Sequence, residues 1–365
     1  MSQKDFRWLI GPALLILTPF FGLPGIMDMR EAQMNFIQCG IYLWFLFFFP
    51  KPIGIFLGYC LAHFFVFNSP EAAKMFQMIT LAAGFFLMVR NTSKTHAKEW
   101  IICLCLFSVL NTLVVIMQMR GIQLKIDLFC FVISYTEGPE RLGYDMWIGH
   151  NGIMGQRVFS GTLSAMTAPL FCFFNPFLSL IPLIALKESV CTAAVAGFVP
   201  AILISYFVSS KKFFYFSSVV ILITAFIFLR KDFNPGMHFE VLKFTFPLIK
   251  NHIFGNGLGS FSELNLSWPK ASMIFKEAHN ETFQIFFEYG FIGIYLFWKI
   301  IKDVSVKFRQ FYSDKALAVL FSALLAFYIA SFGQPTFHVV RIAMPAIAVL
   351  ALFYSRYENL KGSTP

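Results

Sequence analysis

Charged residues are scarce in this chain of 365 residues. Asp, Glu, Lys and Arg together make up 13% of the sequence, whereas about 25% is usual in a soluble domain. Hydrophobic residues reach 58%, and the mean hydropathy is +0.68. This composition excludes an ordinary soluble domain and indicates an integral membrane protein.

Several catalytic motifs are also missing from the sequence. It has no Walker A loop, no G-x-S-x-G, no HExxH and no Asp-x-Asp pair, which argues against ATP-driven coupling and metal-dependent sugar-nucleotide chemistry. The seven cysteines are scattered and odd in number, so they predict neither a disulfide framework nor a zinc site. We therefore expect no metal and no cofactor, and we expect cysteines that serve as small buried hydrophobic residues.

Long apolar blocks are abundant, and many approach the ~20 residues that a helix needs to cross a bilayer. They fall near 8–24, 31–49, 52–68, 72–89, 99–119, 158–174, 176–187, 190–208, 213–229, 282–300, 316–332 and 339–354. The block at 176–187 is short and contains Pro182, so it is also compatible with a re-entrant segment. The predicted fold is all-α and polytopic, with about twelve transmembrane helices in a single membrane domain over 1–365.

The formal net charge is +10, and many of the basic residues lie in short clusters between the apolar blocks. These clusters are Lys4 with Arg7, Lys51, 90–98, 211–212 and 299–315. With twelve spans they all lie on one side, which predicts that both termini are cytoplasmic and that the first helix is retained. This distribution is typical of orientation signals and not of a surface that binds nucleic acid.

Two long loops then face outward, at approximately 120–157 and 230–280. Long loops without a domain of their own are usually functional. The second contains MHFEVLKFTFPLIKNHIF, which is apolar, carries scattered basic residues and is broken at Pro247. We predict a kinked helix on the membrane surface there.

Polar residues begin the apolar block that follows this loop. Asn280 is expected to cap the helix, with Glu281 favourably placed at its positive end. Asn280, Gln284 and Glu288 follow an i, i+4, i+8 spacing and share one face. That face is predicted to line either a water-filled cavity or a hydrogen-bond network between helices.

His279 is the best candidate for acid–base chemistry, because its ordinary pKa lies near neutrality. Glu277 or Glu281 could orient its ring, and the alternative is a solvated loop histidine. Upstream, GNGLG carries three alternating glycines. This stretch predicts a tight turn, which either directs backbone N–H groups to an anion or is simply a turn.

Cations on the predicted outer face are more numerous than orientation requires, which favours an anionic ligand such as a phosphate. Interfacial anchoring is the alternative for most of the lysines. These outer cations are Arg120, Lys125, Arg141, Arg157, Arg230, Lys231, His238, Lys243, Lys250, His252, Lys270, Lys276, His338 and Arg341.

The order IKNHIFGNGLGSF, a gap of about twenty residues and AHNETFQIFFEYGFIGI resembles the signature of the bacterial O-antigen ligase and O-antigen polymerase superfamily. Members carry G-x-G-x-G-x-F, then H-N-x-x-L-Q and E-x-G-x-x-G at the start of a late transmembrane helix. The match covers about forty residues, and Phe283 stands where Leu is usual. The span count and GHNGIMG near Gly149 agree more loosely.

The resemblance implies a metal-independent, inverting glycosyltransferase of the bacterial inner membrane with a periplasmic active site. Its donor would be a glycan on undecaprenyl diphosphate, and its acceptor a sugar hydroxyl on a lipid-linked repeat or on the lipid A core. His279 would be the catalytic base. We expect the substrate-binding residues to be Arg157, Arg141, His238, Arg230, Asn280, Gln284, Glu288 and Arg341.

One departure from the family affects the cations. Members carry Arg, with Trp four residues later, where this chain has His238 and Leu242. Either His238 takes a weaker role in binding phosphate, or Arg230 substitutes, or Arg157 and Arg141 together hold the diphosphate; Arg157 is our first choice.

Modest loops favour a polymerase over a ligase, and the absence of an appended outer domain disfavours protein O-glycosylation. A flippase or transporter for the same lipid is the alternative from another class.

Overall fold

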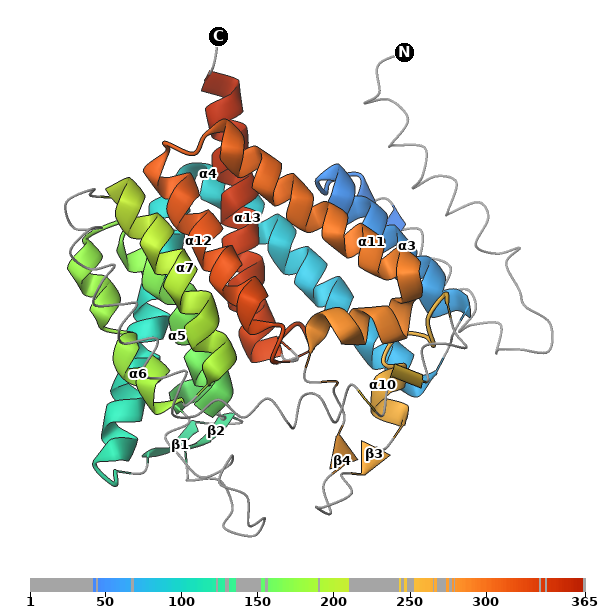
Figure 1. Ribbon diagram of the computed structural model, residues 1–365, viewed down its shortest axis with the longest axis horizontal. Helices are drawn as coiled ribbons and strands as arrows, with labels where there is room; N and C mark the ends of the chain where they lie inside the picture. Colours follow the sequence, from blue (N-terminus) through green and yellow to red (C-terminus); the bar gives the residue numbers. More distant parts are fainter. Residues whose placement is uncertain are drawn as a thin grey trace.

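The computed structural model describes residues 42–43, 45–66, 69–122, 124–128, 131–135, 152–154, 157–189, 191–209, 243, 246–247, 253–264, 266–267, 274–275, 278, 280–334, 336–338 and 340–363. Helices dominate this part of the chain (Figure 1). The helices are α3 (Lys51–Val66), α4 (Pro70–Met119), α5 (Arg157–Phe171), α6 (Leu183–Glu188), α7 (Thr192–Ser209), α10 (Ser260–Glu263), α11 (Glu281–Gln310), α12 (Lys315–Ala330) and α13 (Val340–Ser363), with 3-10 turns η4 (Gly152–Met154) and η5 (Pro176–Leu180). The predicted all-α class is confirmed.

Helix α4 differs from the prediction of two separate spans at 72–89 and 99–119. It is a single helical segment of 50 residues with a kink at His96, where φ is −123° and ψ is 35°. Its two arms meet at the end of the molecule that also holds the end of α13 (Figure 1). The expected connection between two spans is therefore a helical bend.

The segment at 176–187 does not form one continuous helix. It consists of η5 with five residues and α6 with six, both far shorter than a bilayer crossing. Asn175 caps η5 by accepting from the N–H of Phe177, and Pro182 precedes α6. These short helices pack beside α5 and return the chain to the beginning of that helix, where a Cβ atom built on Gly161 would lie 2.2 Å from Oγ of Ser189.

Two small antiparallel hairpins lie in the two loops predicted to face outward. Strands β1 (Leu124–Leu128) and β2 (Phe131–Tyr135) pair so that Leu128 is opposite Phe131. Strands β3 (Leu266–Ser267) and β4 (Ile274–Phe275) pair in the second loop. Of the predicted surface helix at 237–254, the structure describes only residues 243, 246–247 and 253–254.

The main core is formed by α5, α7, α12 and α13 together with α4. Small residues allow α7 and α12 to approach closely: a Cβ atom built on Gly197 would lie 2.4 Å from the carbonyl oxygen of Ala326. Buried polar pairs join α4 to α5, with Asn111 donating to Ser160 at 2.8 Å and Thr167 to Ser108 at 2.7 Å. Small residues and interhelical hydrogen bonds of this kind are typical of helices that pack in membranes.

Four of the five cysteines in the described part are buried, and none of the five forms a disulfide there. Cys60, Cys105, Cys172 and Cys191 lie in the interior, whereas Cys103 is exposed. For these four the expectation of small buried hydrophobic residues is confirmed, while Cys39 and Cys130 lie outside the described residues.

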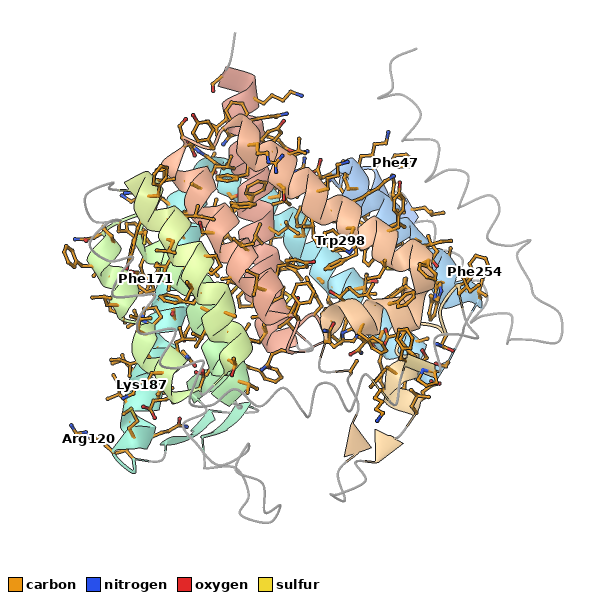
Figure 2. The ribbon with its side chains drawn as sticks, viewed as in Figure 1. Phe47, Arg120, Phe171, Lys187, Phe254 and Trp298 are labelled. Carbon is orange, nitrogen blue, oxygen red and sulfur yellow. The ribbon has the colours of Figure 1, made fainter. Side chains whose placement is uncertain are left out.

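Several predicted basic connections gather at one end of the bundle. Arg90 of α4 pairs with Glu358 near the end of α13 and donates to the carbonyl oxygen of Phe48, just before α3. Arg356 pairs with Asp314, which caps α12. Figure 2 shows Arg120 at the end of the molecule opposite to Phe47.

Two helices in the described part, α4 and α11, are long and apolar enough to cross a membrane. Helices α3, α5, α7 and α12 are apolar but shorter.

Helix α11 is interrupted at Gly290, where φ is +66° and ψ is −162°. A break leaves backbone groups without their helical partners, and in an interior these groups must bond elsewhere. The glycine stretch 253–259 provides the partners. The N–H groups of Asn256 and Gly257 donate to the carbonyls of Phe287 and Glu288, both at 3.0 Å.

Two further hydrogen bonds satisfy backbone groups at the break. The N–H of Phe291 donates to the carbonyl of Ile253 at 3.1 Å, and the Tyr59 hydroxyl of α3 donates to the carbonyl of Tyr289 at 2.8 Å. Positive φ values at Gly255 and Gly290 let the two backbones meet. A Cβ atom built on Gly255 would lie 2.3 Å from the carbonyl oxygen of Glu288.

We predict that Gly290→Ala destabilises the protein, whereas Gly84→Ala does not. A Cβ atom at Gly290 would lie 2.2 Å from the carbonyl oxygen of Ile253, and an L residue in this conformation costs about 1–3 kcal/mol even without the clash. A Cβ atom at Gly84, inside α4, meets nothing within 4 Å and should stabilise by about 0.5–1 kcal/mol. Thermal unfolding of the detergent-purified variants checks both signs; equal effects would contradict the docked glycine loop.

Candidate functional site

The first residue of the candidate site is Asn280, which is the N-cap of α11. Its side-chain oxygen accepts from the N–H of Phe283 at 2.9 Å, as predicted for an N-cap. Its Nδ2 donates to the carbonyl of Phe332 at 2.9 Å, in the connection between α12 and α13. The same residue therefore starts the helix and ties it to that connection.

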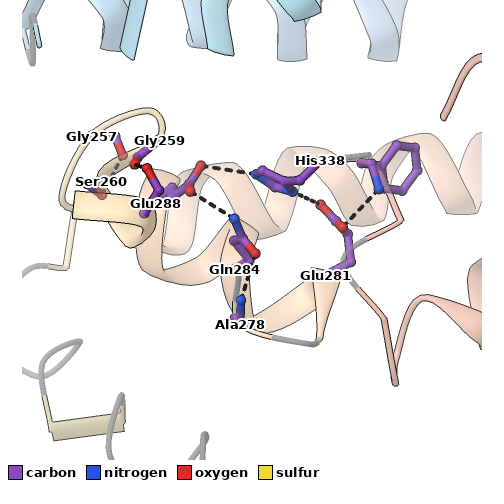
Figure 3. Close-up of polar contacts among 10 residues, drawn as sticks. Gly257, Gly259, Ser260, Ala278, Glu281, Gln284, Glu288 and His338 are labelled. Carbon is purple, nitrogen blue, oxygen red and sulfur yellow. Dashed lines mark hydrogen bonds and ion pairs between the residues drawn. The ribbon is translucent and has the colours of Figure 1, made fainter. Parts of the chain in front are cut away.

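Gln284 and Glu288 form the predicted polar face, and both are buried. Nε2 of Gln284 donates to Oε1 of Glu288 at 3.1 Å (Figure 3). The other end of the amide, Oε1, accepts from the backbone N–H of Ala278 at 3.0 Å. The stripe thus acts as a hydrogen-bond network, which was one of the two alternatives.

Glu281 is fully buried, which the sequence did not indicate for the first residue of the helix. Its Oε2 accepts from the N–H of Phe337 at 3.0 Å, and its own N–H donates to the carbonyl of Ser331 at 2.9 Å. Two ends of the connection between α12 and α13 are therefore fastened to one residue of α11.

His338 lies between the two buried glutamates (Figure 3). Nδ1 is 2.8 Å from Oε1 of Glu281, as an ion pair whose angle departs from that of a hydrogen bond. Nε2 is 3.4 Å from Oε2 of Glu288. The histidine side chain is 8% exposed and the glutamate side chains are 0% exposed, so water screens these charges little.

The electrostatics favour the charged form of this ring. Burial lowers the pKa of His338, but the charges of Glu281 and Glu288 and their contacts with the ring outweigh it. The net result is a pKa of His338 well above its ordinary value. An imidazolium in this position compensates carboxylates that would be costly to bury alone.

His338 was expected to offer its charge to an anion at the outer face. That expectation is wrong, because both ring nitrogens face carboxylates of the protein itself. The glycine turn is likewise occupied at two of its N–H groups, those of Asn256 and Gly257, which bind helix carbonyls. Those two groups are not available to an anion.

The catalytic candidate His279 lies outside the described residues, although Ala278 and Asn280 on either side of it are described. Arg141, His238 and Arg230 also lie outside. Arg157 is the first residue of α5 and Arg341 the second of α13, but their side chains lie outside the described part.

The site therefore joins three predicted residues to two whose role the sequence did not disclose. Asn280, Gln284 and Glu288 were predicted, and their i, i+4, i+8 spacing was a correct signal. Glu281 and His338 were missed as a pair, since 57 residues separate them. Within the described part, no group of three or more His, Cys, Asp or Glu side chains could hold a metal ion.

Comparison with protein-family models and with curated proteins finds no match to this chain.

We predict that the stability of the protein decreases as the pH rises. Because the pKa of His338 is raised in the folded state, its stabilising contribution is complete below the unfolded value of about 6.5 and is lost as pH rises through the folded value. Thermal unfolding between pH 6 and 10 measures this loss. In His338→Gln the loss should be smaller; an unchanged slope in that variant would contradict the assignment.

Proposed function

We propose that the chain is an integral membrane protein with about twelve spans and with its N- and C-termini in the cytoplasm. Both the hydrophobic composition of the chain and the apolar character of its surface support a membrane location. Large apolar side chains are exposed on α3, α4 and α11, and a soluble surface rarely carries so many. Examples are Phe65, Leu81, Leu106, Phe291 and Trp298, all at least half exposed.

The grouping of Arg90, Arg356 and the start of α3 at one end of the bundle favours this orientation. Cytoplasmic ends of membrane helices carry an excess of Lys and Arg. The end that holds Asn280, the glycine loop and the β hairpins then faces the periplasm.

We further propose that the protein is a glycosyltransferase of the O-antigen polymerase type. It would move a glycan from undecaprenyl diphosphate to a sugar hydroxyl at the periplasmic face. The observation that carries this proposal is the buried network around Glu281, Gln284 and Glu288. It fixes the backbone on both sides of His279, in the stretch whose motif resembles that superfamily.

The proposed reaction needs a base, a held leaving group and alignment. The acceptor oxygen attacks the anomeric carbon from the side opposite to the diphosphate, and His279 takes the proton of that hydroxyl. The bond from the anomeric carbon to the diphosphate oxygen breaks, and the electron pair leaves with the lipid diphosphate. Attack in line inverts the anomeric configuration.

The polar atoms of Gln284 and Glu288 are engaged with the protein itself. In this proposal they therefore position His279, and contact with the diphosphate falls to the cationic residues. Arg157 remains the first choice, with Arg141, Arg230, His238 and Arg341 as further candidates.

One observation favours a transporter as a second candidate. Transporters of charged substrates commonly bind them at discontinuous helices, and α11 is broken at Gly290. Here, however, the loop 253–257 and Tyr59 occupy the freed backbone groups, so those groups are not open to a substrate or ion. The transferase is the better supported candidate.

The transferase is tested by glycan profiling in the parent cell, comparing deletion, wild type and His279→Ala at matched membrane expression. For a polymerase, the deletion and His279→Ala both leave a lipid A core that bears one repeat unit. His96→Ala is the matched control, because His96 is exposed on α4, and it should give normal chains.

Other outcomes separate the alternatives. A bare core with long polymer accumulating on the carrier lipid identifies a ligase. Lipid-linked repeats trapped on the cytoplasmic side identify a flippase. Normal chains with His279→Ala exclude His279 as the base.

The orientation is tested by labelling single cysteines in a variant without the seven native ones. Cysteine at Glu263, exposed in α10, should react with a membrane-impermeant maleimide in spheroplasts. Cysteine at Tyr312, exposed between α11 and α12, should react only after the membrane is opened. Equal labelling of both sites in intact spheroplasts would contradict the orientation.

A further inference from the structure

His338 connects two carboxylates that are two helical turns apart. Glu281 and Glu288 are seven positions apart on α11, and one imidazole ring reaches both. The ring comes from outside that helix, in the connection between α12 and α13 (Figure 3). A single side chain therefore links the start of α11, the region of its break and a third segment of the chain.

Both carboxylates lead back to the residue proposed as the base. From Glu288, the path runs through Gln284 to the backbone N–H of Ala278, directly before His279. Glu281 follows His279 by two residues and is bonded to Ser331 and Phe337. Ala278 and Glu281, on either side of His279, are thus each held by hydrogen bonds, and His338 joins the two sets of contacts.

The described side chains offer no other cation that contacts both glutamates. The titratable groups that face Glu288 from neighbouring positions are His63 and Cys60 on α3 and Tyr289 on α11. His63 already meets the carbonyl oxygen of Phe254 at 2.9 Å. Among the described groups, His338 is therefore the cation that can offset the negative charge of both glutamates. His279 and Arg341 are the remaining titratable neighbours in sequence, and their side chains lie outside the described part.

We propose that His338 is a positioning residue for the transfer site: as an imidazolium between Glu281 and Glu288, it holds the segment that carries His279 in the reactive arrangement. This inference rests on the proposed function for its catalytic consequence. It adds a second histidine, with the opposite requirement for protonation. The base His279 must be neutral to accept a proton, whereas His338 must be charged to hold both glutamates.

The pH profile of transfer follows from these opposite requirements. Transfer should decline at low pH, where the base is protonated, and again at high pH, where His338 loses its proton. Misplacement of a reacting group by about 1 Å can reduce a rate about 10²-fold, so His338→Gln should lower the rate by that order near neutral pH. The pH profile of this variant should keep the decline at low pH (the acid limb) and lose the decline at high pH (the alkaline limb).

The experiment uses membranes from the deletion strain that contain the full-length chain and the cell's own lipid-linked glycan. Initial rates of glycan transfer are measured between pH 5 and 10 for wild type, His338→Gln and His96→Gln. His96→Gln is the matched control, since His96 also lies near a glutamate but is 64% exposed, and its profile should equal that of wild type. A parallel loss of rate at every pH in His338→Gln would indicate a merely structural role and overturn the proposal.

A compensating variant guards against misfolding. His338→Gln combined with Glu281→Gln and Glu288→Gln replaces the charged cluster with neutral amides. It should recover expression and thermal stability, and its transfer rate should lack the alkaline limb. An alkaline limb that persists in this variant would assign that limb to another group and overturn the proposal.

A final measurement does not depend on transfer. In a variant without native cysteines, His279→Cys is labelled with a maleimide, with and without His338→Gln. At the same pH, labelling at position 279 should be at least several-fold faster in the variant that also carries His338→Gln. If wild-type membranes show no transfer, the proposed function fails, and equal labelling rates would separately overturn the positioning role.

Discussion

A helix that is broken inside a protein must find partners for the backbone groups that the break releases, and much of this structure follows from that requirement. Gly290 interrupts α11, and the loop at 253–257 supplies N–H and carbonyl groups in place of the helical ones. The loop can approach only because Gly255 and Gly290 lack Cβ atoms. The positions of Glu288 and of the residues bonded to it depend on this junction.

Charge imposes the second constraint on the same region. Two glutamate side chains with no exposed surface are retained, although replacing buried charges with apolar groups is often neutral or stabilising. Each accepts from an amide group, and His338 lies between them. The arrangement joins three parts of the chain, which explains how a short polar segment can be held at the start of an apolar helix.

Local rules predicted a substantial part of this site from the sequence. The cap by Asn280 and the common face of Gln284 and Glu288 follow from helix periodicity, and both are confirmed. The pairing with His338 could not be predicted, because it depends on how α12 and α13 return to α11. Periodicity also predicted an uninterrupted helix at 282–300, so it missed the break at Gly290, and it predicted a connection between two spans where α4 bends at His96 within one helix. For the break in α11, the only local indication in the sequence was a glycine inside the apolar block.

The junction between the glycine loop and α11 also has a consequence for the order of synthesis. The loop at 253–257 leaves the ribosome about thirty residues before the helix carbonyls that it binds. Its N–H groups therefore have no native partner until the first half of α11 has formed, so the loop must remain solvated while the helix is made. The loop can dock only after residues 287–291 have been made, and a delay at that stage would leave the broken helix with unpaired backbone groups.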